Sequence, residues 1–145
     1  MGVSTKAIIS NEEILEFIPQ RAPIVMVDEF FGVDDNLSVS ALKITEDNIF
    51  CEDGLLGECG IIEHIAQGAA LRMGYIYKSA GKAVPIGFIG SVNRFEIFGS
   101  PKVGQKIITE LRVEQELMNI SLVSAQVSCC GEQVARCSMK IFLQE

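Results

Sequence analysis

The chain has 145 residues, of which 48% are hydrophobic and 21% charged, so it can build one domain with a sizeable core and does not have a disordered composition. Its formal charge of −7 argues against a nucleic-acid partner, because phosphate binding needs a cationic face. No apolar run is long enough to span a membrane, and residues 1–10 lack the apolar core of a signal peptide. We therefore expect a single cytoplasmic domain over residues 1–145.

Cysteine and histidine usage bears on metal binding. The five cysteines form an odd set without a C-x-x-C pair, and His64 is the only histidine. This pattern predicts neither a disulfide framework nor a zinc site. We expect no metal, and no cofactor held by the chain itself.

The first part of the chain predicts a short helix followed by two strands and a loop. Ser10 with Glu13 three residues later is a capping box, which predicts a helix that ends at Pro19. The segments that follow are a strand over 24–33, a turn over 34–36, a strand over 37–44 and a loop over 45–59.

One long helix is predicted over 60–79, ended by Gly81. Apolar residues cover most of its circumference, which is typical of a buried helix. Strands are then predicted over 85–95, 105–116, 120–130 and 133–143, with reversals at Asn119 and Gly131. The whole is an α+β pattern, in which an antiparallel sheet of about six strands wraps around one central helix. Its open sheet edges favour dimerisation.

Three stretches carry a family resemblance. They are Ile-Pro-Gln-Arg-Ala-Pro-Ile-Val-Met-Val-Asp over 18–28, Gly-Ile-Ile-Glu-His-Ile-Ala-Gln over 60–67, and Gly87-Phe88-Ile89 through Arg94-Phe95, followed by Pro101 and Gly104. In order and spacing they resemble the FabZ-type dehydratases, which remove water from 3-hydroxyacyl chains on acyl carrier protein. The resemblance implies a hotdog fold, an acyl carrier protein partner, a substrate carried on phosphopantetheine, and a homodimer or a trimer of dimers.

The departures from that family concern its histidines. The family's catalytic histidine lies in a glycine-histidine-phenylalanine-proline stretch ahead of the central helix, whereas residues 48–57 contain no histidine and no proline. The histidine of the opening motif is replaced by Gln20. This loop resembles the divergent dehydratase-like proteins of aryl polyene and flexirubin-type pigment pathways. It also raises the alternative of a heterodimer with an active dehydratase.

The implied reaction needs a base, an acid and donors that polarise the thioester carbonyl. The resemblance implies that Glu63 acts as the acid or positions the hydroxyl, and Gln67, one turn further on, could orient its carboxyl group. The backbone N–H groups of Gly60 and Ile61 are candidate donors to the thioester oxygen. The plainer alternatives are that Glu63 is simply favourable at a helix start and that Gly60 shapes the turn.

The remaining candidates each have a plain alternative. Phe88 and Ile89 could line an acyl tunnel, with Phe95, Phe98 and Met73, or belong to the core. His64 lies about 100° round the helix from Glu63, which favours a core or interface histidine, although a partner subunit's copy could approach. The cations Arg94, Lys102 and Lys106 could meet the acidic carrier protein or form a solvated rim.

Three functions remain open from the sequence. The first is a 3-hydroxyacyl-(acyl carrier protein) dehydratase, a hydro-lyase that gives the trans-2-enoyl thioester and acts through Glu63. The second is a non-catalytic hotdog subunit that binds acyl carrier protein or supports an active partner. The third is an acyl thioesterase in which the helix carboxylate activates water. Fold alone does not separate them, and the first is the one we expect.

Overall fold

The computed structural model describes residues 2–144. Its elements in chain order are β1 (Ile9–Ser10), the 3-10 helix η1 (Asn11–Glu16), β2 (Glu29–Asp34), β3 (Leu37–Lys43), β4 (Cys51–Glu52), β5 (Leu55–Leu56), α1 (Glu58–Ser79), β6 (Ile86–Ile97), β7 (Lys106–Leu117), β8 (Ile120–Cys129) and β9 (Glu132–Gln144).

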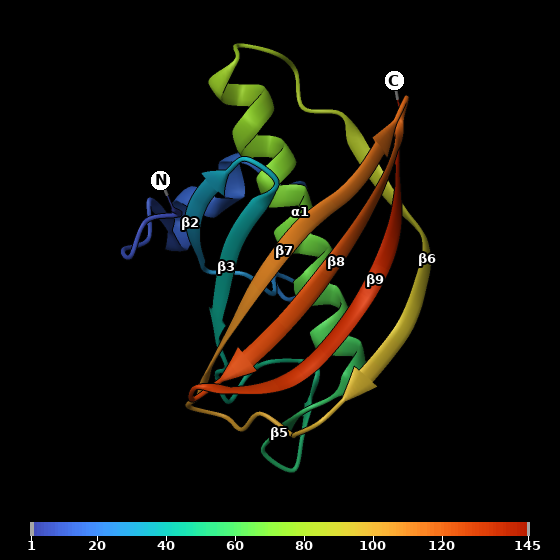
Figure 1. The fold of residues 1–145 in the computed structure, drawn as a ribbon. Helices are drawn as coiled ribbons and strands as arrows, with labels where there is room; N and C mark the ends of the chain where they lie inside the picture. The colour runs from blue at the N-terminus through green and yellow to red at the C-terminus, as the bar shows by residue number, and fades with distance from the viewer. Residues whose placement is uncertain (1, 145) are drawn as a thin grey trace.

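A seven-stranded sheet curves around α1 (Figure 1). The strand order is β1-β2-β3-β7-β8-β9-β6, and every neighbouring pair is antiparallel. Alternate residues of β7, namely Ile107, Thr109, Leu111 and Val113, are buried, as expected for a strand with one face on the core. The predicted α+β hotdog architecture is confirmed, with seven strands in the main sheet where about six were expected, the short β1 included.

The helix α1 contributes to two hydrophobic clusters. Ile61 and Ile65 pack with residues of β7, β8 and β9, and Leu71 packs with Ile14 of η1 and Phe30 of β2. Glycines allow close approach on this side. A Cβ on Gly68 would lie 2.6 Å from the Ser40 hydroxyl of β3, and one on Gly74 would overlap the carbonyl oxygen of Phe17. The helix is therefore fixed against β3 and against the segment that follows η1.

Several predicted boundaries were wrong. The helix η1 follows Ser10 as predicted, but it ends at Glu16 and not at Pro19, and the Ser10 side chain makes no capping bond. The Ser10 backbone pairs with Glu29 in the β1–β2 ladder. The strand predicted over 24–33 begins only at Glu29, since peptide groups of residues 24–26 bond to side chains of α1 instead of a strand. The predicted loop over 45–59 contains the β4–β5 hairpin, and α1 begins at Glu58, two residues before Gly60.

The strand β6 forms one edge of the sheet (Figure 1). Its first residues are apolar and exposed: Ile86 and Phe88 are each 55% exposed, and Ile89 is 45% exposed. An edge strand of this kind presents unpaired backbone groups beside apolar side chains. Dimerisation stays a prediction. Within residues 2–144 no helix is both long and apolar enough to cross a bilayer.

Candidate active site

Gln67 links the central helix to the opening motif. Its side-chain Nε2 donates to the Ile24 carbonyl at 2.8 Å and to Glu63 Oε2 at 2.7 Å, and its Oε1 accepts from the Met26 N–H at 2.6 Å. Gln67 is fully buried, so these bonds hold both the backbone of the opening motif and the carboxylate of Glu63. The expectation that Gln67 orients Glu63 agrees with this contact, while its catalytic role stays a prediction.

His64, next to Glu63 in sequence, lies in the core. Its Nδ1 is 2.7 Å from the Met26 carbonyl oxygen and must donate to it, so Nε2 accepts from the Thr109 hydroxyl at 2.8 Å. Burial lowers the pKa of His64 to about 4, even though the bond to Met26 raises it. The ring is therefore neutral, fully buried and bonded at both nitrogens. It is a core histidine, and it is not available to a partner subunit.

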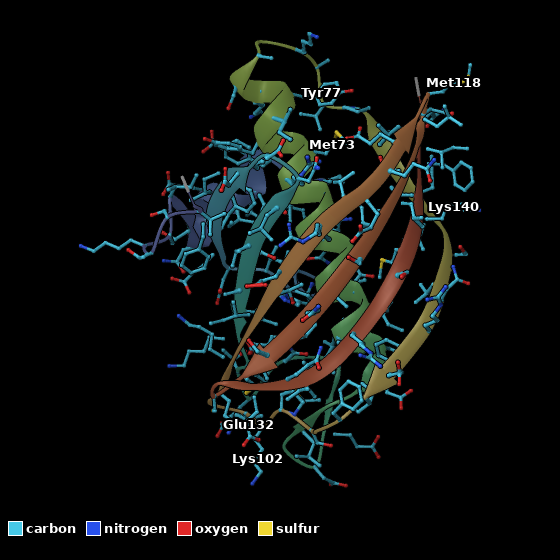
Figure 2. The ribbon with its side chains drawn as sticks, in the orientation of Figure 1. Met73, Tyr77, Lys102, Met118, Glu132 and Lys140 are labelled. Carbon is cyan, nitrogen blue, oxygen red and sulfur yellow. The ribbon has the colours of Figure 1, made fainter. Side chains whose placement is uncertain are left out.

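An apolar cavity of about 530 Å³ lies between α1 and the sheet. Glu63, Ala66, Ala70 and Met73 face it from α1, and Figure 2 marks Met73 on the upper half of that helix. Other walls come from the segment 15–21, from 84–89, and from residues of β7, β8 and β9. Phe88 and Ile89 both line it, and their role in holding an acyl chain stays a prediction. Glu63 is half-buried, so its carboxylate belongs to the wall and remains partly accessible.

The predicted thioester donors lie apart from this cavity. The backbone N–H groups of Gly60 and Ile61 both donate to the Gly57 carbonyl, at 3.1 and 3.2 Å, because the helix begins earlier than predicted. Both residues are buried, and neither lines the cavity. The structure therefore places Glu63, Phe88 and Ile89 on one cavity, with Gln67 bonded to Glu63 from behind, and leaves Gly60 and Ile61 out. Their role as donors stays a prediction.

Two polar groups of the cavity were missed as site residues. Gln20 and Arg72 both line it, and the buried atoms Gln20 Oε1 and Arg72 Nε have no hydrogen-bond partner within residues 2–144. Such orphan groups are uncommon in native proteins and call for an explanation. The sequence carried a signal for each: Gln20 replaces a histidine of the opening motif, and Arg72 is a charged residue inside a helix predicted to be buried.

Other candidate groups fall outside the cavity. Lys106 is paired with Glu29 at 2.6 Å, while Arg94 and Lys102 are exposed, so these cations remain compatible with either a carrier-protein contact or a solvated rim. Among residues 2–144 no cluster of three or more histidine, cysteine, aspartate or glutamate side chains could hold a metal ion.

Comparisons with known proteins identify the family and the fold. The chain is 28% identical over 135 residues to the 3-hydroxyacyl-(acyl-carrier-protein) dehydratase FabZ of Oceanobacillus iheyensis, covering 83% of this chain and 93% of that protein. Its fold is similar to the dehydratase heterocomplex ApeI:P from Xenorhabdus doucetiae, with a TM-score of 0.83, 17% identity and 91% of each chain covered.

A more distant likeness is to a hypothetical thioesterase with coenzyme A from Streptococcus pneumoniae, with a TM-score of 0.65, 10% identity, and 80% of this chain and 84% of that one covered. At such identities the structural likenesses establish the fold alone. The family match is direct: residues 12–145 match the ApeP-like family, described as ApeP dehydratase. The chain therefore belongs to the ApeP-like dehydratase family, a FabZ-like branch of the hotdog fold.

Proposed function

We propose that this protein takes part in the dehydration of 3-hydroxyacyl thioesters carried on acyl carrier protein, with Glu63 acting on the departing hydroxyl. One observation carries the proposal: the Glu63 carboxylate stands on the wall of an apolar cavity and is held there by Gln67. The cavity suits an acyl chain, because most of its lining residues are apolar, including side chains from α1 and from four strands.

The dehydration removes a proton from C2 and the hydroxyl group from C3. A base removes the proton at C2 of the 3-hydroxyacyl thioester, and its electron pair forms the C2–C3 double bond. The C3–O bond breaks, and the oxygen leaves as water with a proton from the Glu63 carboxyl group. The base then releases its proton and the Glu63 carboxylate takes one up, so both groups return to their starting states and the net change is the loss of one water. Gln67 keeps Oε2 of this carboxyl group in one position through the cycle.

The base that removes the C2 proton is neither an imidazole nor a thiolate of the described cavity lining. The cavity lining within residues 2–144 contains no histidine and no cysteine, and His64 is bonded on both nitrogens elsewhere. A second subunit is the natural source of such a group. The exposed apolar start of β6 borders the same cavity through Ile86, Phe88 and Ile89. The likeness to a dehydratase heterocomplex supports the same conclusion, so we propose that another hotdog subunit docks on β6 and completes the site.

The experiment incubates a 3-hydroxyacyl carrier protein with the purified chain, alone and with a candidate hotdog partner, and follows the acyl group by mass spectrometry. We expect loss of one water in the presence of the partner. Glu63→Gln should abolish the loss, because the amide keeps the shape and removes the transferable proton. Glu58→Gln is the matched control, since this exposed glutamate of the first turn of α1 lies outside the cavity.

Other outcomes contradict the proposal. Release of free acid would favour a thioesterase, and unchanged substrate with measurable binding would favour a non-catalytic subunit. Full activity in the Glu63→Gln variant would remove Glu63 from the mechanism.

A further inference from the structure

Arg72 is a buried cation without a charge partner at bonding distance. Its residue is only 8% exposed, it lines the cavity, and its Nε has no hydrogen-bond partner within residues 2–144. The two ion pairs in this part of the chain, Lys106–Glu29 and Arg136–Glu96, do not include it. Burial lowers the pKa of Arg72, and the charge of Glu116 on β7 offsets this only in part.

The buried guanidinium group of Arg72 lowers the stability of the fold. Burying a charge without pairing it is unfavourable, and a neutral side chain of similar length would fill the same space without that cost. Guanidinium groups also carry N–H donors in a fixed fork that matches anionic oxygens. The Nε–H of Arg72 is therefore a donor without an acceptor among the described residues, in a cavity whose other lining residues are mainly apolar, and an anionic oxygen would satisfy it.

Because Glu63 and Arg72 lie on the same helix, their relative position follows from helix geometry. Glu63 and Arg72 are nine positions apart, which places them about 13.5 Å apart along the helix axis and about 180° apart around it, at the two margins of the cavity-facing side. Ala66, Ala69 and Ala70 lie between them along the helix and line the cavity. A chain whose reactive end meets Glu63 would thus run past an apolar strip before its far end reaches Arg72.

We propose that Arg72 receives an anionic oxygen, such as a carboxylate, at the far end of the acyl chain, so that the cavity selects acyl groups with a polar terminus over plain alkyl groups. This inference rests on the proposed function in taking the cavity as the acyl site. It names a specificity residue that lies far from the reacting atoms and does not take part in the dehydration chemistry.

The test measures binding and is independent of turnover. Saturated acyl-pantetheine thioesters are prepared as pairs of equal chain length, one ending in methyl and one in carboxylate, over a series of lengths. Calorimetry gives the dissociation constants for the wild-type chain with its hotdog partner. At the best-fitting length we expect the carboxylate probe to bind about tenfold or more tightly than its methyl counterpart, since a charge-assisted pair is stronger than a neutral contact.

Three variants sharpen the result. Arg72→Met should equalise the two probes, and Arg72→Lys should restore part of the preference. Arg21→Met is the matched control, because Arg21 is on the same cavity but already donates to the Ile18 and Gln20 carbonyls at 2.8 Å. It should leave the ratio unchanged.

The outcome separates this inference from the proposed function. A preference that persists in Glu63→Gln, a variant expected to lack dehydration, supports the Arg72 site on its own. Equal binding of both probes by the wild-type chain at every length overturns the inference, even if dehydration through Glu63 is observed. An Arg72→Met variant that lowers the melting temperature and leaves the ratio unchanged also overturns it, because Arg72 would then be structural.

Discussion

Buried polar side chains on the two sides of α1 differ in whether their hydrogen-bonding groups have partners. On the packed side, His64 and Gln67 are fully buried, and every polar atom of their side chains takes part in a hydrogen bond. On the cavity side, Arg72 keeps a buried Nε with no partner, and Gln20 across the cavity keeps a buried Oε1 with none. Neighbouring residues of one helix thus belong to two different environments.

This difference in hydrogen bonding separates side chains of α1 that stabilise the fold from side chains that are available to a ligand. Native proteins satisfy nearly all buried polar groups, so a satisfied pair such as His64 and Gln67 is explained by the fold itself. The fold does not explain a buried polar group that faces a cavity without a hydrogen-bond partner, so such a group marks a place where a ligand is expected. Glu63 stands at the boundary, held by Gln67 from the packed side and facing the cavity on the other. Four measurements sharpen or break this division.

The largest expected effect is on the packed side. His64→Ala removes a fully buried ring and leaves the Met26 carbonyl and the Thr109 hydroxyl without their partner, so we expect a loss of about 4 kcal/mol in the free energy of unfolding. Met73→Ala, on the half-buried cavity side, should cost only about 1 kcal/mol. Urea denaturation compares the two, and equal losses would break the division.

A pH effect should follow from the same histidine. The pKa of His64 is about 4 in the folded chain against 6.5 ordinarily, so between these values the unfolded chain binds a proton that the folded chain does not. Stability should therefore fall as pH is lowered through this window, by about 3 kcal/mol in all. Burial raises the pKa of Asp28 above its ordinary value of 3.8, so the folded chain binds the extra proton there and this contribution has the opposite sign from pH 3.8 upward.

Because His64 is the only histidine, the difference between wild type and His64→Gln isolates its contribution. Thermal unfolding at a series of pH values should show the wild type losing stability more steeply than the variant between pH 6.5 and 4. Parallel curves would mean that His64 is not a buried neutral ring.

A smaller effect tests how tightly the packed side is closed. Glycine to alanine ordinarily favours a helix, but a Cβ at Gly74 would overlap the Phe17 carbonyl oxygen, so we expect Gly74→Ala to cost about 2 kcal/mol. Gly68→Ala meets the Ser40 hydroxyl, which can rotate away, and should cost less. Chemical denaturation of both variants checks the order, and a gain in stability at Gly74 would contradict it.

The smallest effect has the opposite sign and belongs to the cavity side. Arg72→Met should raise the free energy of unfolding of the ligand-free chain by about 1 kcal/mol, because it removes a poorly compensated buried charge and keeps an unbranched side chain. Calorimetric melting of wild type and variant measures the change. A loss of stability would place Arg72 among the groups that the fold itself needs.

Much of the fold could be predicted from the sequence. The buried helix and the strands after it followed from periodicity, because alternation and helical spacing report which face meets the core. The reversals at Asn119 and Gly131 were placed correctly for the same local reason. Other starts were less predictable: α1 begins at Glu58, two residues before the predicted Gly60, and the peptide groups of residues 24–26 bond to side chains more than 35 positions away.

Some features of the candidate site could also be predicted from the sequence, and others could not. The sequence by itself determined the family motifs and singled out Glu63 and Gln67, because their spacing on one helix is a local property. Only the tertiary structure decided that Gln67 holds Ile24 and Met26, that Gly60 and Ile61 lie away from the cavity, and that Arg72 lies unpaired within it. The physical reason is that hydrogen-bond satisfaction depends on which distant groups meet in space, and local sequence patterns do not encode that.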